Sequence, residues 1–259
     1  IYRVDASGTL HTRSLPMKSL PFVHDMALTR RFAIVVLPAT RFDIPATLLG
    51  LKTPVASLQL DDGPGEAWLV PRDGGDPVRI AVPPGFVFHW AHAYEDGESV
   101  VLEGVKYDGF PALDGLDGIF DRPEATELLA RPVRLSLDLS AGTAIETALA
   151  PHAMELPSAL GTGADRVLVG VGAPPERRHP FLSCVVRINE QDQATTRDFA
   201  PHLPGEPVVA GSYLLVPVYR HEAPARLHVL SAADLSTVAC LELPHAVPSP
   251  LHGLWIPTA

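Results

Sequence analysis

Three of the eleven histidines stand in apolar surroundings, where an imidazole could face the inside of a folded protein. They are His24 in Pro-Phe-Val-His-Asp-Met-Ala-Leu-Thr (21–29), His89 in Phe-Val-Phe-His-Trp-Ala-His-Ala-Tyr-Glu-Asp-Gly (86–97) and His252 in Leu-His-Gly-Leu-Trp-Ile-Pro (251–257). Each follows a short apolar segment and precedes a strand-like stretch or the last residues of the sequence. Imidazole binds iron, zinc, copper and nickel well, so the three together could form a metal site.

A metal site is not the default interpretation of any one of these histidines. A single imidazole beside aromatic side chains more often packs or forms a hydrogen bond than binds a metal. No two of the three have the short separation of a zinc finger or of a His-Glu-x-x-His helix. Residue types and spacing therefore leave a structural role and a metal-binding role both open.

The elements that must position these histidines are expected to be short. The 259 residues include 27 prolines, about twice the usual share of ~5%, and proline is poorly tolerated inside helices. Short apolar or alternating runs closed by Gly, Pro or Asp predict strands. The clearest runs are 32–37, 66–70, 78–82, 99–107, 133–138, 166–171, 181–188, 213–219, 226–230 and 237–243.

Turn signals and strand spacing together predict an all-β fold. Residues 72–76 and 231–235 each predict a hairpin turn between consecutive predicted strands. One helix is predicted over 122–130, where Pro123 lies near the start. Many short strands at a spacing of ~8–12 residues indicate a sandwich, a barrel or a propeller. No convincing repeat period selects among these three.

Charge and composition narrow the class of protein. The formal net charge is −10, and no basic stripe is present, which argues against a nucleic-acid partner. The longest apolar run, 32–38, is far shorter than the ~20 residues of a membrane span. Two cysteines, Cys184 and Cys240, cannot build a disulfide framework or a four-cysteine zinc site. We expect a cytoplasmic location and, since the sequence opens with Ile inside a strand-like segment, a truncated chain.

Taken together, the three histidine segments resemble the carotenoid cleavage oxygenase family, which includes retinoid isomerases, epoxycarotenoid dioxygenases and stilbene dioxygenases. Residues 24–29 resemble its His-Asp-Phe-Ala-(Ile/Leu)-Thr segment. Residues 88–97 resemble its Phe-His-x-x-Asn-Ala-(Tyr/Trp)-Glu-(Glu/Asp)-Gly segment, with His92 in place of the asparagine. Residues 252–255 resemble its closing His-Gly-x-(Trp/Phe), so the three matches occur in the family's order.

Two glutamate segments between these matches also resemble the family. Residues 154–157, which contain Glu155, are similar to its Glu-(Phe/Leu)-Pro segment, and residues 205–208, which contain Glu206, are similar to its Gly-Glu-Pro-Val segment. The resemblance implies that each glutamate accepts a hydrogen bond from a ligand histidine, with Glu155 beside His89 and Glu206 beside His252. Such a carboxylate would fix the tautomer and orientation of the imidazole ring.

The resemblance implies a fold and a metal. The expected fold is all-β, the C-terminal blades of a seven-bladed β-propeller with few short helices. Residues 1–259 would be the C-terminal part of a single propeller domain whose N-terminal half is absent. The implied cofactor is Fe(II), with metal ligands His24, His89 and His252 and a fourth histidine upstream. No catalytic residue beyond these ligands is implied.

The implied reaction is the cleavage of a C=C double bond by O2, giving two carbonyl products. The substrate would be an apolar carotenoid, apocarotenoid or stilbene, and the protein could contact a membrane surface because such substrates reside in lipid. Three alternatives stay open: an inactive fragment with an incomplete metal site, a zinc hydrolase with three histidine ligands, and a protein-binding propeller without metal.

Overall fold

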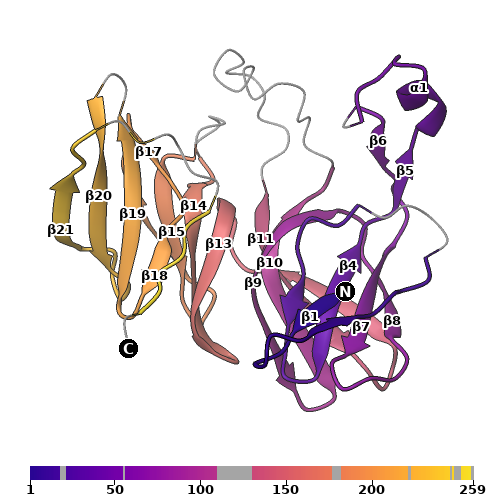
Figure 1. The fold of residues 1–259 in the computed structure, drawn as a ribbon. Helices are drawn as coiled ribbons and strands as arrows, with labels where there is room; N and C mark the ends of the chain where they lie inside the picture. Colours follow the sequence, from indigo (N-terminus) through magenta and orange to yellow (C-terminus); the bar gives the residue numbers. More distant parts are fainter. Residues whose placement is uncertain are drawn as a thin grey trace.

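The computed structural model describes residues 1–17, 22–54, 56–109, 130–176, 182–220, 223–245, 247 and 252–257. Within these residues the chain is built mainly from strands, with one short helix, α1 (Ile44–Leu48). Figure 1 shows the strands gathered into sheets that stand side by side in the order of the chain.

Four antiparallel sheets follow one another, each with its strands in nearly sequential order. The first contains β3 (Ala27–Leu28), β4 (Phe32–Leu37), β7 (Gly65–Pro71) and β8 (Val78–Val82). The second contains β9 (Phe86–Asp96), β10 (Ser99–Tyr107), β11 (Arg131–Asp138) and β12 (Thr143–Ala148). The third contains β13 (Ala153–Thr162), β14 (Asp165–Ala173), β15 (Cys184–Ile188) and β16 (Ala194–Asp198). The fourth contains β17 (Leu203–Pro204), β18 (Val208–Ala210), β19 (Tyr213–Arg220), β20 (Ala223–Ser231) and β21 (Thr237–Glu242).

Two smaller pairs of strands lie outside the four sheets. One hairpin joins β1 (Tyr2–Val4) to β2 (Leu10–Thr12). The other pairs β5 (Thr40–Phe42) with β6 (Leu58–Leu60) and, together with α1, forms a projection from the connection between β4 and β7 (Figure 1).

The apolar cores lie between successive sheets. Between the first and second sheets, Ile34 and Leu69 pack with Leu102 and Leu137. A second cluster joins residues of the second and third sheets, and a third joins the third and fourth. Meandering four-stranded sheets packed face to face in a row are blades of a β-propeller.

The all-β expectation is confirmed, and all ten predicted strands are found. Those at 32–37, 78–82 and 99–107 match β4, β8 and β10, and both predicted hairpin turns join the strands expected. The strand predicted from 181 begins at Cys184. The helix predicted over 122–130 lies outside the described residues except for Ala130.

Among the strands of five or more residues, the prediction missed β9, β12, β13 and β16, and it was wrong about one histidine. His89 was expected where a strand starts, but it lies inside the eleven-residue strand β9. The first strands of the sheets contact one another: β3 and β13 both contact β9, and β18 contacts β13. The histidine segments lie at this meeting point.

Candidate metal centre

The three singled-out histidines come together although they are far apart in the sequence. His24 precedes β3, His89 lies in β9, and His252 lies in the segment 252–257, which has no regular secondary structure. The ring centres of His24 and His89 are 5.2 Å apart, and those of His89 and His252 are 5.1 Å apart. The two pairs are nearly perpendicular, at 84° and 74°.

Two β-bulges in β9 determine which face of the second sheet the side chain of His89 occupies. Phe88 and Ala91 have no partner in β10, whereas His89 pairs with Val105 and Trp90 pairs with Gly104. Residues paired across strands share a face, so His89 faces the third sheet with Val105, and Trp90 faces the first sheet. In a regular strand the side chains of Phe86 and His89 would lie on opposite faces.

Glu155 holds the His89 ring from the neighbouring sheet. Its Oε2 atom lies 2.7 Å from Nδ1 of His89 and also accepts the backbone N–H of Leu156, at 2.8 Å. Both side chains are largely buried, at 18% exposed for His89 and 14% for Glu155. A bulge at Leu156 and Pro157, opposite Gly170, interrupts the ladder just after Glu155. The carboxylate directs the proton of His89 to Nδ1 and leaves Nε2 as the free nitrogen.

Glu206 contacts His252 in a similar way. Its Oε1 atom lies 3.4 Å from Nδ1 of His252, and its Oε2 atom accepts the N–H of Gly253 at 2.6 Å. Glu206 lies just before the hairpin of β18 and β19. Its carboxylate therefore attaches the segment 252–257 to the fourth sheet.

Burial and charge act differently on the imidazoles. Burial, aided by the neighbouring His89, lowers the pKa of His24. Burial also lowers the pKa of His89, but the hydrogen bond and charge of Glu155 outweigh it, so that this pKa is raised overall. Burial and the nearby Glu155 carboxylate raise the pKa of Tyr107, which keeps its proton.

The imidazoles border one cavity of about 260 Å³. Its lining residues are His24, Asp25, His89, Trp90, Leu156, Pro157, Glu206 and His252. The Nε2 atom of His89 is buried and has no hydrogen-bond partner among the described residues. A buried ring nitrogen with its lone pair free is suited to bind a metal ion.

The ring separations fit a shared metal ion. A metal about 2.1 Å from an imidazole nitrogen lies roughly 3.2 Å from the ring centre, so two rings bound at 90–110° have centres about 4.5–5.2 Å apart. Both measured separations, 5.2 and 5.1 Å, fall in this range. Even so, no three His, Cys, Asp or Glu side chains in the described part of the chain are arranged so that they could hold a metal ion together. The donor chemistry and the ring separations fit a metal, but the described side chains do not form a metal site by themselves.

The sequence model of the retinal pigment epithelial membrane protein family matches residues 1–257. The chain belongs to this family of carotenoid oxygenases. Apocarotenoid-15,15'-oxygenase of Synechocystis sp. is 30% identical over 281 residues, covering 100% of this chain and 56% of the relative. A probable chloroplastic carotenoid cleavage dioxygenase 4 of Arabidopsis thaliana is 24% identical over 288 residues, covering 98% of this chain and 46% of the relative.

Solved structures of carotenoid oxygenases share the fold. A point variant of the Synechocystis apocarotenoid oxygenase superposes with a TM-score of 0.88 at 28% identity, covering 99% of this chain and 58% of that one. A cobalt-substituted form of the same oxygenase gives a TM-score of 0.88 at 27% identity, with the same coverage. The chain thus spans about half the length of the relatives it matches.

The departure from the family's motif at His92 lies away from the cavity. Its Nε2 atom is 3.1 Å from the carbonyl oxygen of Gly163, and its ring stacks obliquely on Tyr94. His11, on the β1–β2 hairpin, pairs with Asp5 at 2.9 Å. Neither imidazole lines the histidine cavity.

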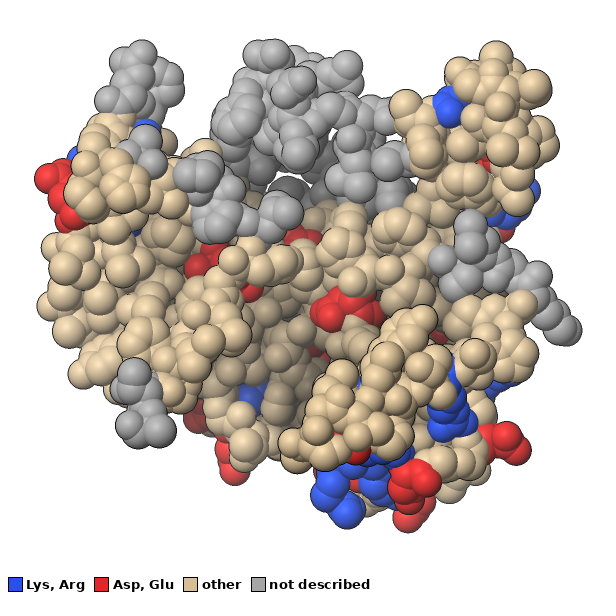
Figure 2. Space-filling view, in the orientation of Figure 1, with Lys and Arg blue, Asp and Glu red and all other residues tan. Residues whose placement is uncertain are grey.

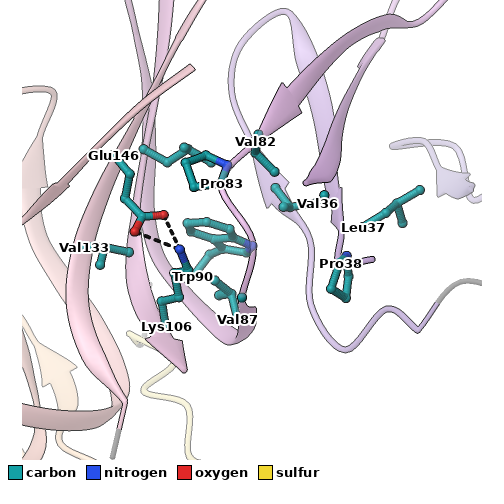
Figure 3. Close-up of a pocket in the computed structure, with 13 residues that line it drawn as sticks. Val36, Leu37, Pro38, Val82, Pro83, Val87, Trp90, Lys106, Val133 and Glu146 are labelled. Atoms are coloured by element: carbon teal, nitrogen blue, oxygen red, sulfur yellow. Dashed lines mark hydrogen bonds and ion pairs between the residues drawn. The ribbon is translucent and has the colours of Figure 1, made fainter. Parts of the chain in front are cut away.

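A second, much smaller cavity lies beside Trp90 (Figure 3). It holds about 20 Å³, which is room for about one water molecule. Its polar groups are Lys106 and Glu146, whose atoms approach to 2.6 Å. Trp90 borders both cavities.

Sequence reasoning missed three groups at the centre: Asp25, Tyr107 and the bulge at Leu156 and Pro157. Asp25 and the bulge residues lie inside the matched motifs, which therefore pointed to their segments without giving their roles. Tyr107 ends a predicted strand, and nothing in the sequence distinguishes it from a core residue.

Proposed function

We propose that this chain belongs to a non-haem Fe(II) dioxygenase that cleaves a C=C double bond of a carotenoid, apocarotenoid or stilbene-type substrate with O2. The observation that carries the proposal is the meeting of three imidazoles around one cavity, two of them held by carboxylates. Both oxygen atoms of O2 would enter the products, one in each carbonyl group, as the double bond breaks.

His24, His89 and His252 would hold the iron, with a fourth histidine supplied by the part of the protein upstream of this chain. Bound Fe(II) would supply the redox chemistry that lets O2 react with an alkene. Glu155 and Glu206 would keep the Nδ1 protons of His89 and His252 in place, so that each ring presents Nε2. The residues of this chain would thus act by holding the ligands and excluding water.

A cavity beside His24 is lined mainly by apolar residues, which supports a hydrophobic substrate. It has a volume of about 620 Å³ and shares His24 and Asp25 with the histidine cavity. Its apolar lining residues are Ile1, Tyr2, Leu15, Met17, Val23, Met26 and Val35, and Thr12, Arg13 and Ser14 add polar groups. A polyene lying there would reach the imidazoles from the side of the first sheet.

We also propose that the protein is cytoplasmic and contacts a membrane surface through the projection that carries α1. Leu48, Leu49 and Leu51 are 81%, 73% and 74% exposed there, and Figure 2 shows mostly uncharged side chains on it. Among the described residues, no helix is long and apolar enough to cross a membrane. Apolar side chains that enter the interface would bring the protein to substrates dissolved in lipid.

Residues 1–259 would form the C-terminal part of one propeller domain, which the upstream polypeptide completes. We call that complete protein the parent polypeptide. The test is elemental analysis of the parent polypeptide from iron-supplemented cells, beside its His89→Ala variant. We expect near-stoichiometric iron, lost in the variant. Zinc together with hydrolytic activity would favour the three-histidine hydrolase, and a metal-free protein would leave a propeller without this chemistry.

A further inference from the structure

Asp25 joins the segments that carry two of the three histidines. It directly follows His24, and its Oδ2 atom accepts the backbone N–H of Trp90, at 2.8 Å. Its Oδ1 atom accepts the N–H of Met26, at 2.7 Å. Trp90 directly follows His89, so one carboxylate links the residue after one histidine to the residue after the other.

The position of Trp90 explains why its N–H needs a side-chain acceptor. β9 is the end strand of its sheet, and amides on its free edge have no neighbouring strand to bond. Trp90 also lies between the bulges at Phe88 and Ala91, where the ladder with β10 is irregular. A largely buried amide without an acceptor is unfavourable, so the Asp25 carboxylate stabilises the edge of β9 at this point.

We propose that Asp25 is a positioning residue that fixes the His24 segment to the edge of β9 and so sets the separation of His24 from His89. This inference rests on the proposed function, because its purpose is to place two ligands of one metal. The hydrogen bonds span only the residues adjacent to the histidines, so the short link leaves little freedom to the rings, whose centres are 5.2 Å apart. Asp25 also lines the same cavity.

A purely local role for Asp25 makes a different prediction. If its only task were to accept the N–H of Met26, removing it would disturb one turn and leave the histidine pair unchanged. Asp138 is the matched control: its Oδ1 accepts the N–H groups of Ser140 and Ala141 in the turn between β11 and β12. It does not line the histidine cavity.

The experiment compares Asp25→Ala, Asp25→Asn and Asp138→Ala in the parent polypeptide. One readout is the Fe(II) dissociation constant by chelator competition. The other is hydrogen exchange of the Trp90 amide in metal-free protein, which is independent of any activity. We expect Asp25→Ala to weaken iron binding by about 10-fold or more and to expose the Trp90 amide to exchange. Asp25→Asn retains only one acceptor oxygen and is expected to show a smaller effect in the same direction.

The two readouts separate this inference from the proposed function. Wild-type iron affinity together with a protected Trp90 amide in Asp25→Ala would overturn the positioning role. An equal loss of iron in Asp138→Ala would also overturn it. If the wild-type parent binds no iron, the proposed function fails, and the exchange rate alone decides whether Asp25 holds the two segments together. Should Asp25→Ala not fold, Asp25→Asn decides by the same criteria.

Discussion

At the scale of single residues, the centre depends on where each imidazole keeps its proton. Glu155 is largely buried and lies within hydrogen-bond distance of Nδ1 of His89, while Nε2 is buried without a protein partner in the described part of the chain. Glu206 approaches His252 less closely, at 3.4 Å, and the side chain of His252 is 55% exposed. The better-held ring is therefore His89.

We expect Glu155→Gln to weaken metal binding by about 10–100-fold, the usual cost of losing a group that orients a metal ligand. The amide keeps the shape of the side chain but removes its charge and offers N–H groups toward the ring. Chelator competition on the parent polypeptide would measure the change. Glu242→Gln is the control, because Glu242 pairs with Arg220 and Arg226 on the fourth sheet. Equal affinities in the two variants would refute the role of Glu155.

The apolar surroundings singled out the three histidines, but only the family motifs predicted a shared metal site and drew attention to the two glutamates. Residue types and spacing left a metal site unproven, since the distances that matter join positions at least 46 residues apart in the sequence, as with Glu206 and His252. The hydrogen bond from the N–H of Trp90 to Asp25 depends on how the loop before β3 passes the edge of β9. No local pattern encodes that contact.

At the scale of elements, β9 was missed because its side chains do not alternate. The bulges at Phe88 and Ala91 put Phe86, His89 and His92 on one face, a spacing of three residues. Alternation with a period of two is the signal by which strands are recognised in a sequence. The regular neighbour β10 was predicted with its correct bounds, Ser99–Tyr107.

Gly104 lies opposite the irregular part of β9 and allows its close approach. A Cβ atom there would lie 2.7 Å from the carbonyl oxygen of His89 and 2.7 Å from the Trp90 ring. We expect Gly104→Ala to lower the free energy of unfolding by about 1–3 kcal/mol, as overpacking does, and to reduce iron content. Denaturant unfolding and elemental analysis would check this. Gly63→Ala is the control, since a Cβ there meets Ala39 at an ordinary 3.8 Å; equal stability of both variants would contradict the prediction.

The projection with α1 yields a prediction about membranes. Replacing Leu48 and Leu49 by Ser removes two of its most exposed apolar side chains and is expected to lower binding of the parent polypeptide to phospholipid vesicles, measured by flotation. Leu241→Ser, at a leucine 51% exposed on β21, is the control. Unchanged flotation of the double variant would exclude the projection as the membrane contact.

At the scale of the molecule, an ion network joins the second and third sheets. Glu103, 0% exposed, accepts hydrogen bonds from Arg166 of the third sheet, at 2.7 Å, and from Arg134 of its own sheet, at 2.8 Å. Arg166 also donates to Asp192, in the turn before β16, at 2.8 Å. The network connects sheets whose remaining contacts are mainly apolar.

Breaking this network should be costly, because it leaves a buried charge without its main partner. We expect Arg166→Met to lower the free energy of unfolding by about 3–5 kcal/mol, measured by denaturant unfolding of the parent polypeptide. The double variant with Glu103→Leu should recover part of the loss, since both charges are then removed. Arg226→Met, at an exposed pair on the fourth sheet, should change stability far less. A loss in Arg166→Met no larger than this would refute the network's role.

The arrangement of sheets could be predicted only in part. Strand runs and turns indicated an all-β protein but did not choose among a sandwich, a barrel and a propeller. The choice depends on packing of whole faces, such as Leu69 of β7 against Leu102 of β10, which the pattern of either strand alone does not specify.

The two bulges in β9 have a consequence for how the protein could change in evolution. Phe88 and Ala91 are the bulge residues, which have no partner in β10. A variant that lost either one could therefore keep the pairing of the other residues. Deleting Phe88, however, removes the aromatic ring 4.9 Å from His24. Such a deletion would keep the strand pairing of β9 with β10 but remove one aromatic contact of His24. A deletion in β9 is therefore expected to weaken the proposed metal site before it disrupts the strand pairing of the propeller.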